Sequence, residues 1–152
     1  MATLGVACTS SCAYLAVADV ESVLEGKPER LAFRDGLSDA DRLVEFGKDV
    51  ARALRDAGAS EVVVLRAVSN YSDTHTGWTD RLAMETLIRL ECAKAGVPCR
   101  YLSQQAVKGA LGLTGRGGLA KLGEGRVARS GKYWGDGRGV AALAAVAGEQ
   151  RA

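Results

Sequence analysis

The chain has 152 residues, 47% of them apolar and 25% charged, with a net charge of +2. This length and balance are typical of one compact domain with a buried core, so we predict a single domain over residues 1–152. No apolar run is long enough to span a bilayer, and the first residues lack the basic start of a signal peptide. We therefore expect no membrane partner and a cytoplasmic location.

The four cysteines do not form the closely spaced pairs of a zinc site. Cys8 and Cys12 are separated by three residues, Cys92 and Cys99 by six, and the chain has a single histidine. Structural zinc sites usually combine tight pairs with matching partners elsewhere. We therefore expect reduced thiols in a reducing compartment, with no resident cofactor.

The charged residues are unevenly distributed along the chain. Residues 100–138 contain eight Lys or Arg and two acidic residues, a balance of +6, whereas residues 1–99 contain eleven basic and fifteen acidic residues, a balance of −4. A concentrated basic segment on a near-neutral protein is typical of a phosphate-rich partner. A solvated loop with incidental charge explains the same count, so charge alone leaves both interpretations open.

The first third of the chain has the pattern of strands, and the period then becomes helical. Short stretches of small apolar and β-branched residues, separated by turn formers, predict strands over residues 3–8, 12–20 and 29–35. From residue 38 on, apolar residues recur three and four apart, which predicts a helix that Ser38 or Asp39 caps and Gly58 ends. The apolar run 60–68 predicts a strand covered on both faces.

The second half alternates loops, helices and one more strand. A polar loop over residues 69–79 precedes a helix over 80–95 that Gly96 ends. A short strand and a third helix follow within 98–113, the glycine-rich stretch 114–139 predicts a loop, and an alanine-rich helix closes the chain. This order predicts an α/β fold with a mixed five-stranded sheet: an antiparallel meander first, then parallel strands, with helices on both faces.

Three segments, taken in order, follow one family pattern. LGVACTSSCAYLAV matches a first hairpin of the form I-G-I-D-P-G-x-x-x-x-G-Y-x-V. Residues 60–118 match a central block with a strand, an aromatic-bearing loop, a helix, a Gly-Val-Pro step, a Q-V-K motif and a G-x-G turn. GDGRGVAALAAVAG matches a closing helix, D-A-x-D-A-x-A-x-A. Together they resemble the RuvC family of Holliday-junction resolvases, which implies a ribonuclease-H-like fold and a homodimer through the helix Asp80–Ala95.

The resemblance also implies a two-metal nuclease site, but most of its ligands are replaced. In this family, carboxylates from the first strand, a middle strand and the last helix hold two divalent ions that activate water and stabilise the leaving oxygen. These four positions fall on Ala7, Arg66, Asp136 and Gly139. Because a guanidinium repels a metal ion and only Asp136 is an acid, efficient cleavage is not expected and no metal is assigned. An internal ion pair between Arg66 and Asp136 is one explanation of the replacement.

The positions that would contact a nucleic acid are retained. Lys108 matches the Q-V-K lysine, which the resemblance places close to a backbone phosphate. Tyr71 and Trp78 match the loop that the resemblance inserts into the junction, where a ring can stack on an unpaired base. Packing over the following helix is the alternative for these rings. Further phosphate contacts are predicted for Arg66 and for the basic stretch formed by Arg116, Lys121, Arg126, Arg129, Lys132 and Arg138.

The leading interpretation is a protein that binds DNA, in particular branched DNA such as a four-way junction, without efficient cleavage. One alternative is an active structure-selective endonuclease with an Mg²⁺ or Mn²⁺ site rebuilt around Asp136. Its further acids would come from Asp19, Asp73, Asp80 and Glu85, although Asp80 is better explained as a helix cap. The other alternative is a protein-interaction module that reuses the fold without nucleic acid, because a fold does not fix a function.

Overall fold

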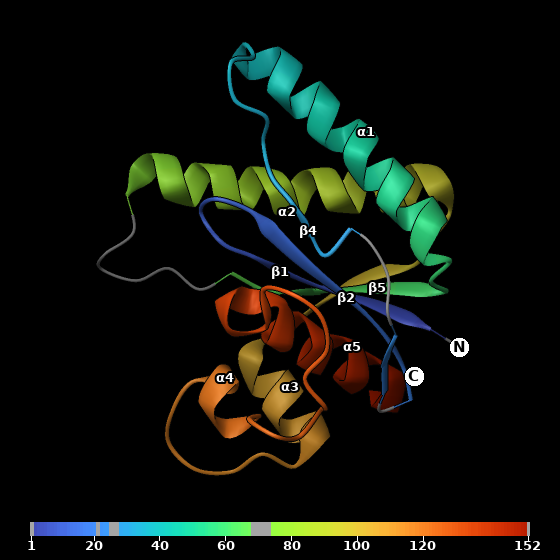
Figure 1. Ribbon diagram of the computed structural model, residues 1–152, viewed down its shortest axis with the longest axis vertical. Coiled ribbons are helices and arrows are strands. Elements are labelled where there is room, and N and C mark those ends of the chain that lie inside the picture. The colour runs from blue at the N-terminus through green and yellow to red at the C-terminus, as the bar shows by residue number, and fades with distance from the viewer. Residues whose placement is uncertain (1, 21, 25–27, 68–73, 152) are drawn as a thin grey trace.

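The computed structural model describes residues 2–20, 22–24, 28–67 and 74–151. A mixed sheet lies at the centre of the molecule, and helices cover both of its faces (Figure 1). The strands are β1 (Thr3–Cys8), β2 (Ala13–Asp19), β3 (Ser22–Leu24), β4 (Arg30–Leu31), β5 (Glu61–Leu65) and β6 (Cys99–Leu102). Five of them lie side by side in the order β3-β2-β1-β5-β6, and the two-residue β4 pairs with β2 as a sixth.

The sheet has the predicted division into an antiparallel and a parallel part. β1 pairs with β2, and β2 with β3, in antiparallel register, whereas β5 is parallel to both β1 and β6. The strand predicted over residues 29–35 is wrong in extent, because only Arg30 and Leu31 pair with β2. The chain then leaves the sheet, and the ring of Phe33 packs 5.0 Å from that of Phe46 in the first helix. Burial of Phe33 against that helix is favoured over continued strand pairing.

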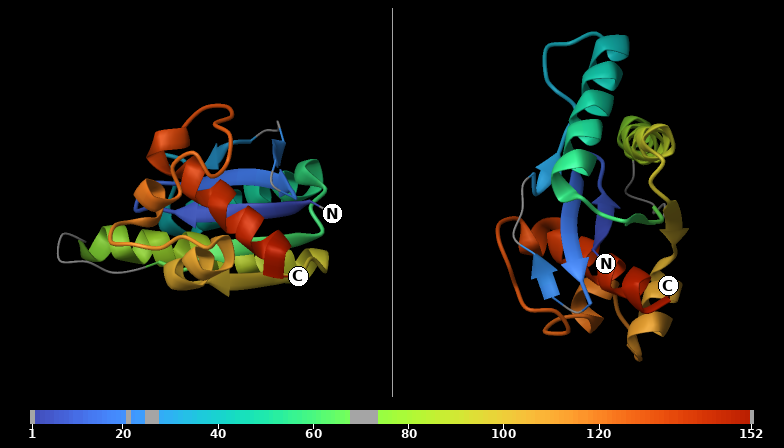
Figure 2. Two further views of the ribbon diagram at one scale, coloured as in Figure 1. Left: turned by 90° about the horizontal axis from the view of Figure 1, so that it is seen from below. Right: turned by 90° about the vertical axis from the view of Figure 1, so that its right-hand side faces the viewer.

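The helices are α1 (Asp39–Ala57), α2 (His75–Ala95), α3 (Gln104–Leu111), α4 (Leu119–Leu122) and α5 (Gly139–Arg151). α1 and α2 cover one face of the sheet, and α3, α4 and α5 cover the other (Figure 2). The ends of α1 confirm the prediction. The Ser38 hydroxyl accepts from the Asp41 N–H at 3.2 Å, and Gly58 adopts the left-handed conformation that ends the helix.

α2 begins five residues before the predicted start at Asp80. The Thr74 hydroxyl caps it by accepting from the Gly77 N–H at 3.0 Å. Asp80 is therefore inside the helix, and its carboxylate forms an ion pair with Arg42 of α1 at 3.0 Å. The interpretation of Asp80 as a cap is wrong, because the helix begins earlier, where the side chain of Thr74, six residues before Asp80, satisfies one of its free N–H groups.

The glycine-rich stretch predicted as a loop is partly folded. It contains α4 and a wide turn over Trp134–Arg138 that leads directly into α5. Leu119 and Val127 are buried among the side chains of α5 and α3. Two apolar anchors thus tie the segment to the core, since each buried side chain of this size contributes about 1.5–3 kcal/mol.

α5 lies unusually close to the central strand β1. Its residues from Ala141 to Gly148 are all buried, and most of them are alanine. A Cβ on Gly5 of β1 would overlap the carbonyl of Ala141, so only glycine permits this approach. Within the part of the chain that the structure describes, no helix has the length and apolar character needed to cross a bilayer.

Candidate nucleic-acid interface

Two of the predicted site positions lie at the same end of the sheet. Ala7 is the register partner of Leu65 in the parallel pair β1 and β5, so Arg66 directly follows that pair. Ala7 is buried on the face covered by α5. Arg66 is exposed, and its backbone N–H donates to the Leu102 carbonyl at 2.8 Å. The strand ends that would carry carboxylates in a two-metal nuclease therefore present a methyl group and a guanidinium.

The start of α5 supplies the other two positions, and there is no room for a side chain at one of them. Asp136 is exposed in the wide turn, and Gly139 is the first residue of α5. A Cβ on Gly139 would lie 2.9 Å from Nε1 and 3.0 Å from the carbonyl oxygen of Trp134. Since real Cβ atoms do not approach so closely, a carboxylate at position 139 requires Trp134 to move.

Tyr14 fills the space between Ala7 and the wide turn. It is the antiparallel register partner of Ala7 and is buried, and its ring packs directly against Gly137. A hydrogen bond to Cys12, followed by burial, raises the pKa of Tyr14 to about 12, and the charge of Asp136 adds to this increase. The phenol therefore stays protonated at neutral pH, beside the one carboxylate that survives from the expected site.

The described residues do not fit a two-metal site. Asp19 lies at the opposite end of β2 from Tyr14, where it pairs with Ser22, and Asp80 is engaged with Arg42. Glu85 is buried on the α2 side of the sheet, and Asp73 lies outside the described residues. Among those residues, no three His, Cys, Asp or Glu side chains are placed to hold a metal ion together. No step of a metal-dependent reaction is derived from this arrangement.

Comparisons with known proteins show similarity in structure but not in sequence. Neither protein-family models nor curated protein sequences match the chain. Solved structures do match. T. thermophilus RuvC in complex with Holliday junction substrate superposes with a TM-score of 0.73 and 16% identity, covering 99% of this chain and 93% of that one. The Thermus thermophilus RuvC structure gives the same TM-score and identity, with 99% and 94% covered. The chain has a RuvC-like fold.

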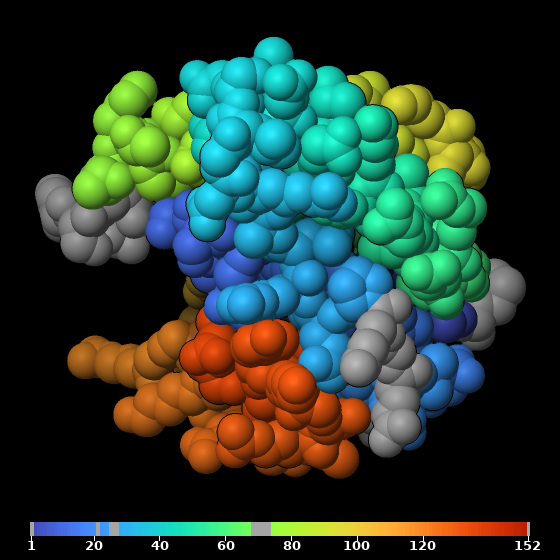
Figure 3. All heavy atoms as spheres, turned by 45° about the horizontal axis from the view of Figure 1, so that its top comes forward, coloured from blue at the N-terminus to red at the C-terminus, as the bar shows by residue number. Residues whose placement is uncertain are grey.

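The basic stretch lies on the α5 side of the sheet. Arg116, Lys121, Arg129 and Lys132 are exposed and Arg126 is half-buried. The ammonium of Lys108 in α3 donates to the Gly117 carbonyl at 3.0 Å, which ties this lysine to the glycine turn before α4. Figure 3 shows a hollow at one edge of the molecule, between the start of α2 and the side chains that project near α4. Exposed basic side chains are suited to a phosphate backbone.

Arg138 does not belong to this exposed surface, which corrects its assignment to nucleic-acid contact. Its side chain is 1% exposed. Nε donates to the Leu15 carbonyl at 2.9 Å, a second nitrogen donates to the Ser130 carbonyl, and Glu29 lies 3.8 Å away. A buried cation needs such partners, so Arg138 connects the segment around Ser130 to β2 and is unavailable to a ligand.

Arg66 and Asp136 do not form the ion pair considered from the sequence. No such contact is present between these two described side chains. The guanidinium carbon of Arg66 lies 5.6 Å from the ring centroid of Tyr101 in β6, a cation–π contact on the α2 side of the sheet. Arg66 therefore lies on the α2 side of the sheet, whereas Asp136 lies on the α5 side. The guanidinium of Arg66 is available for an anionic partner.

Of the two predicted stacking residues, the structure describes one. Tyr71 lies outside the described residues. Trp78 is in the first turn of α2 and not in the preceding loop, and it is half-buried. The same turn contacts the β1–β2 connection, where a Cβ on Gly77 would lie 3.1 Å from the Cβ of Ser10. Trp78 is thus held in place by the start of the helix.

Sequence reasoning did not select a second group of charged residues, located on α2. Arg81, Glu85 and Arg89 are four residues apart, which places them on one face of the helix. Glu85 is 2% exposed and accepts from the Ala67 N–H at 3.1 Å. The four-residue spacing of these charges is visible in the sequence. Its importance depends on Tyr101 and Arg66, which come close to this helix only when the chain folds.

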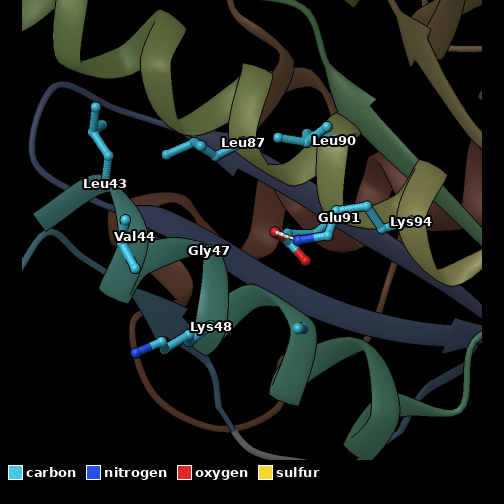
Figure 4. A pocket seen from close by; sticks show the side chains of 9 residues that line it. Leu43, Val44, Gly47, Lys48, Leu87, Leu90, Glu91 and Lys94 are labelled. Carbon is cyan, nitrogen blue, oxygen red and sulfur yellow. Dashed lines mark hydrogen bonds and ion pairs between the residues drawn. The ribbon is translucent and has the colours of Figure 1, made fainter. Parts of the chain in front are cut away.

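The outer surface of α2 carries exposed apolar side chains. Leu82 and Leu90 are 39% and 51% exposed, and Val44 of α1 is 56% exposed, whereas Met84 and Ile88 face the core. Figure 4 shows the groove between the two helices, which is lined by Leu43, Val44, Gly47, Lys48, Ala51, Leu87, Leu90, Glu91 and Lys94. Exposed leucines and a valine on one side of the molecule are typical of a protein interface.

Proposed function

We propose that this protein binds DNA, with a preference for branched DNA such as a four-way junction, and does not cut it by a two-metal mechanism. One observation carries the proposal. The strand ends of a RuvC-like fold carry Ala7 and Arg66 in place of carboxylates, and the chain has further exposed cations in the basic stretch on the α5 side. A guanidinium at this place attracts a phosphate and repels a divalent ion. DNA binding also agrees with the cytoplasmic location expected from the sequence.

Each side chain has a defined role in this proposal. Arg66 and Lys108 contact phosphates near the strand ends, and the exposed part of the basic stretch contacts the adjoining backbone. Trp78, together with Tyr71, stacks on unpaired bases at the branch point, which contributes about 1–3 kcal/mol per base. The residues assigned to phosphate contact in the stretch are Arg116, Lys121, Arg126, Arg129 and Lys132. One of the solved RuvC structures is a complex with a Holliday junction, which supports the choice of partner.

The proposal includes a homodimer through the outer surface of α2. Leu90 and Leu82 would meet the same residues of a second copy, and a two-fold protein matches the symmetry of a junction. Light scattering should give twice the mass of one chain for the wild type. Leu90→Glu should reduce this to one chain, whereas Leu37→Glu, at an exposed leucine before α1, should leave the dimer intact. A wild-type monomer at all concentrations would contradict this part of the proposal.

The test of binding is fluorescence anisotropy of a labelled four-way junction and of a duplex with the same sequences, each at about 50 and 200 mM salt. A protein with 6–10 phosphate contacts should lose roughly 10³–10⁵ in affinity between these conditions. Each mixture is then separated on a denaturing gel after incubation with Mg²⁺, Mn²⁺ or chelator. Salt-sensitive junction preference without nicks supports the proposal.

The two alternatives are distinguished by the same experiment. Nicks that depend on metal would show an active endonuclease with a rebuilt site around Asp136. Absence of salt-sensitive binding to either DNA would point to an interaction module, because the exposed cations then serve no phosphate partner. In either case the proposed function would be wrong.

A further inference from the structure

A second cationic cluster lies on the other face of the sheet from the basic stretch. Arg81 and Arg89 flank Glu85 on one face of α2, and Glu85 accepts from the Ala67 N–H directly after β5. This hydrogen bond connects the helix to the strand end that carries Arg66. Three arginines, two from α2 and one from the end of β5, therefore lie around the contact between this helix and this strand end.

Tyr101 of β6 lies beside two of these arginines, Arg66 and Arg89. The guanidinium carbon of Arg89 is 4.9 Å from its ring centroid, and that of Arg66 is 5.6 Å away. Cation–π contacts of this kind contribute about 0.5–1 kcal/mol at exposed sites and orient a guanidinium without neutralising its charge. Tyr101 thus positions two arginines. Arg89 also donates a hydrogen bond to its hydroxyl, and a guanidinium has five N–H groups, so further donors of both arginines remain for a ligand.

The cluster has more positive charge than its own carboxylate can balance. Burial raises the pKa of Glu85 above its usual range, although the charges of Arg81 and Arg89, the Ala67 amide and Tyr101 act in the opposite direction. Between described residues, none of the three arginines forms an ion pair, and Nε of Arg81 is buried without a hydrogen-bond partner. Nε of Arg42 is also buried without a hydrogen-bond partner, but Arg42, like Arg34 and Arg100, has a carboxylate oxygen within 3.0 Å. An unmatched buried donor is costly and calls for an anionic acceptor.

We propose that Arg66, Arg81 and Arg89 form an anion site that takes a phosphodiester group of a bound DNA strand. The choice of DNA as the source of the phosphate rests on the proposed function, whereas the anion site itself rests on the cluster. Guanidinium groups bind phosphate oxygens in pairs of parallel hydrogen bonds, so three of them suit a tetrahedral oxyanion. Trp78 lies three residues before Arg81 and therefore on the same side of α2, where the base next to that phosphate can stack.

The site is tested first with inorganic tripolyphosphate, which needs no DNA. Increasing concentrations should raise the thermal midpoint of the wild type, because a ligand that binds only the folded state stabilises it. Arg81→Gln/Arg89→Gln should lose most of this rise. Arg52→Gln/Arg55→Gln, which removes the same charge from the exposed surface of α1, should keep it. Arg89→Gln alone, at an exposed residue, gives the same readout if the double variant does not fold.

A second cationic surface on the molecule provides the decisive comparison. Lys121→Gln/Arg129→Gln removes two charges from the basic stretch. If this variant loses the tripolyphosphate response and Arg81→Gln/Arg89→Gln keeps it, the anion site is at the basic stretch and the assignment to α2 is wrong. A response that is equal in all variants would also overturn it.

Binding of the four-way junction then tests whether the phosphate in this site comes from DNA. Arg81→Gln/Arg89→Gln should lower the slope of log affinity against log salt by about 0.9, since the site holds one phosphate and each lost phosphate contact changes the slope by about that amount. Junction affinity should fall about tenfold or more at moderate salt. A wild type that responds to tripolyphosphate but does not bind the junction would refute DNA as the source and leave the anion site in place. An unchanged slope in the double variant would refute the phosphodiester contact.

Discussion

The two cationic regions of this molecule are built in opposite ways. The basic stretch on the α5 side is contiguous in sequence, rich in glycine and largely exposed. The α2 cluster combines residues from positions 66, 81 and 89 around a buried carboxylate and a tyrosine ring. A run of charges in a sequence therefore identifies only the first kind. The stretch also contains Arg138, whose charge is used inside the fold, so counting charges overestimates the surface available to a ligand.

The largest effect on stability is expected when Arg138 is replaced, and it should exceed the effect of replacing an exposed arginine nearby in the sequence. Arg138→Ala leaves Glu29 without its buried partner, and breaking such a pair costs about 3–5 kcal/mol of unfolding free energy. Arg129→Ala, at an exposed side chain, should change the free energy by less than about 0.5 kcal/mol. Chemical denaturation of both variants measures the difference. Equal stabilities would show that Arg138 is not an internal structural residue.

The next effect concerns the start of α5, where the expected metal ligand is replaced by glycine. Gly139→Ala places a methyl group against Trp134, and overpacking of this kind costs about 1–3 kcal/mol. Gly109→Ala in α3, where nothing lies within 4 Å, should instead stabilise by about 0.5–1 kcal/mol through helix propensity. Thermal or urea unfolding measures both the loss of stability expected for Gly139→Ala and the gain expected for Gly109→Ala. A neutral Gly139→Ala would mean that Trp134 moves easily and that a carboxylate could be restored there.

A smaller effect on stability, which depends on pH, is expected from the carboxylate of Glu85 in the α2 cluster. Because burial raises the folded-state pKa of Glu85 above its ordinary value of 4.5, the folded protein holds this proton more tightly than the unfolded chain. The contribution of Glu85 to stability therefore falls as pH rises from about 4.5 through the raised pKa, and then stays constant. Glu85→Gln keeps an acceptor for Ala67 and removes this dependence.

Urea midpoints between pH 4.5 and 8 provide the measurement for Glu85. The stability of Glu85→Gln relative to wild type should rise with pH across that window, and should be equal or higher at neutral pH. Glu124→Gln, on the exposed surface near α4, should follow the wild-type profile. A Glu85→Gln variant that becomes less stable than wild type as pH rises would show that the surrounding arginines outweigh burial.

The smallest effect on stability is expected in the basic stretch. Lys121→Gln/Arg129→Gln should leave the free energy of unfolding within about 0.5 kcal/mol of wild type. The salt slope of junction binding should fall by about 1.8, as expected for two lost phosphate contacts. Both cationic regions would then contribute to the salt dependence of junction binding. An unchanged salt slope would show that Lys121 and Arg129 do not contact DNA phosphates.

The pattern of the sequence predicted most of the fold. Alternation and helical spacing placed β1, α1 and the parallel strands correctly, because each buries an apolar face that repeats with a fixed period. The cap at Thr74 was missed, since the polar residues before α2 look like a loop. The strand over residues 29–35 was overextended, because Phe33 is as apolar as a strand residue but is buried against α1.

For the candidate site, the sequence by itself predicted which chemistry is missing: the resemblance places alanine, arginine and glycine at three of the four carboxylate positions. It also located the exposed cations of the basic stretch, because these are neighbours along the chain. Only the tertiary structure decided that Arg138 is internal, that Trp134 occupies the space beside Gly139, and that Arg66 and Arg89 both lie against the ring of Tyr101. The physical reason is that burial and charge balance depend on contacts between residues distant in sequence, which no local pattern encodes.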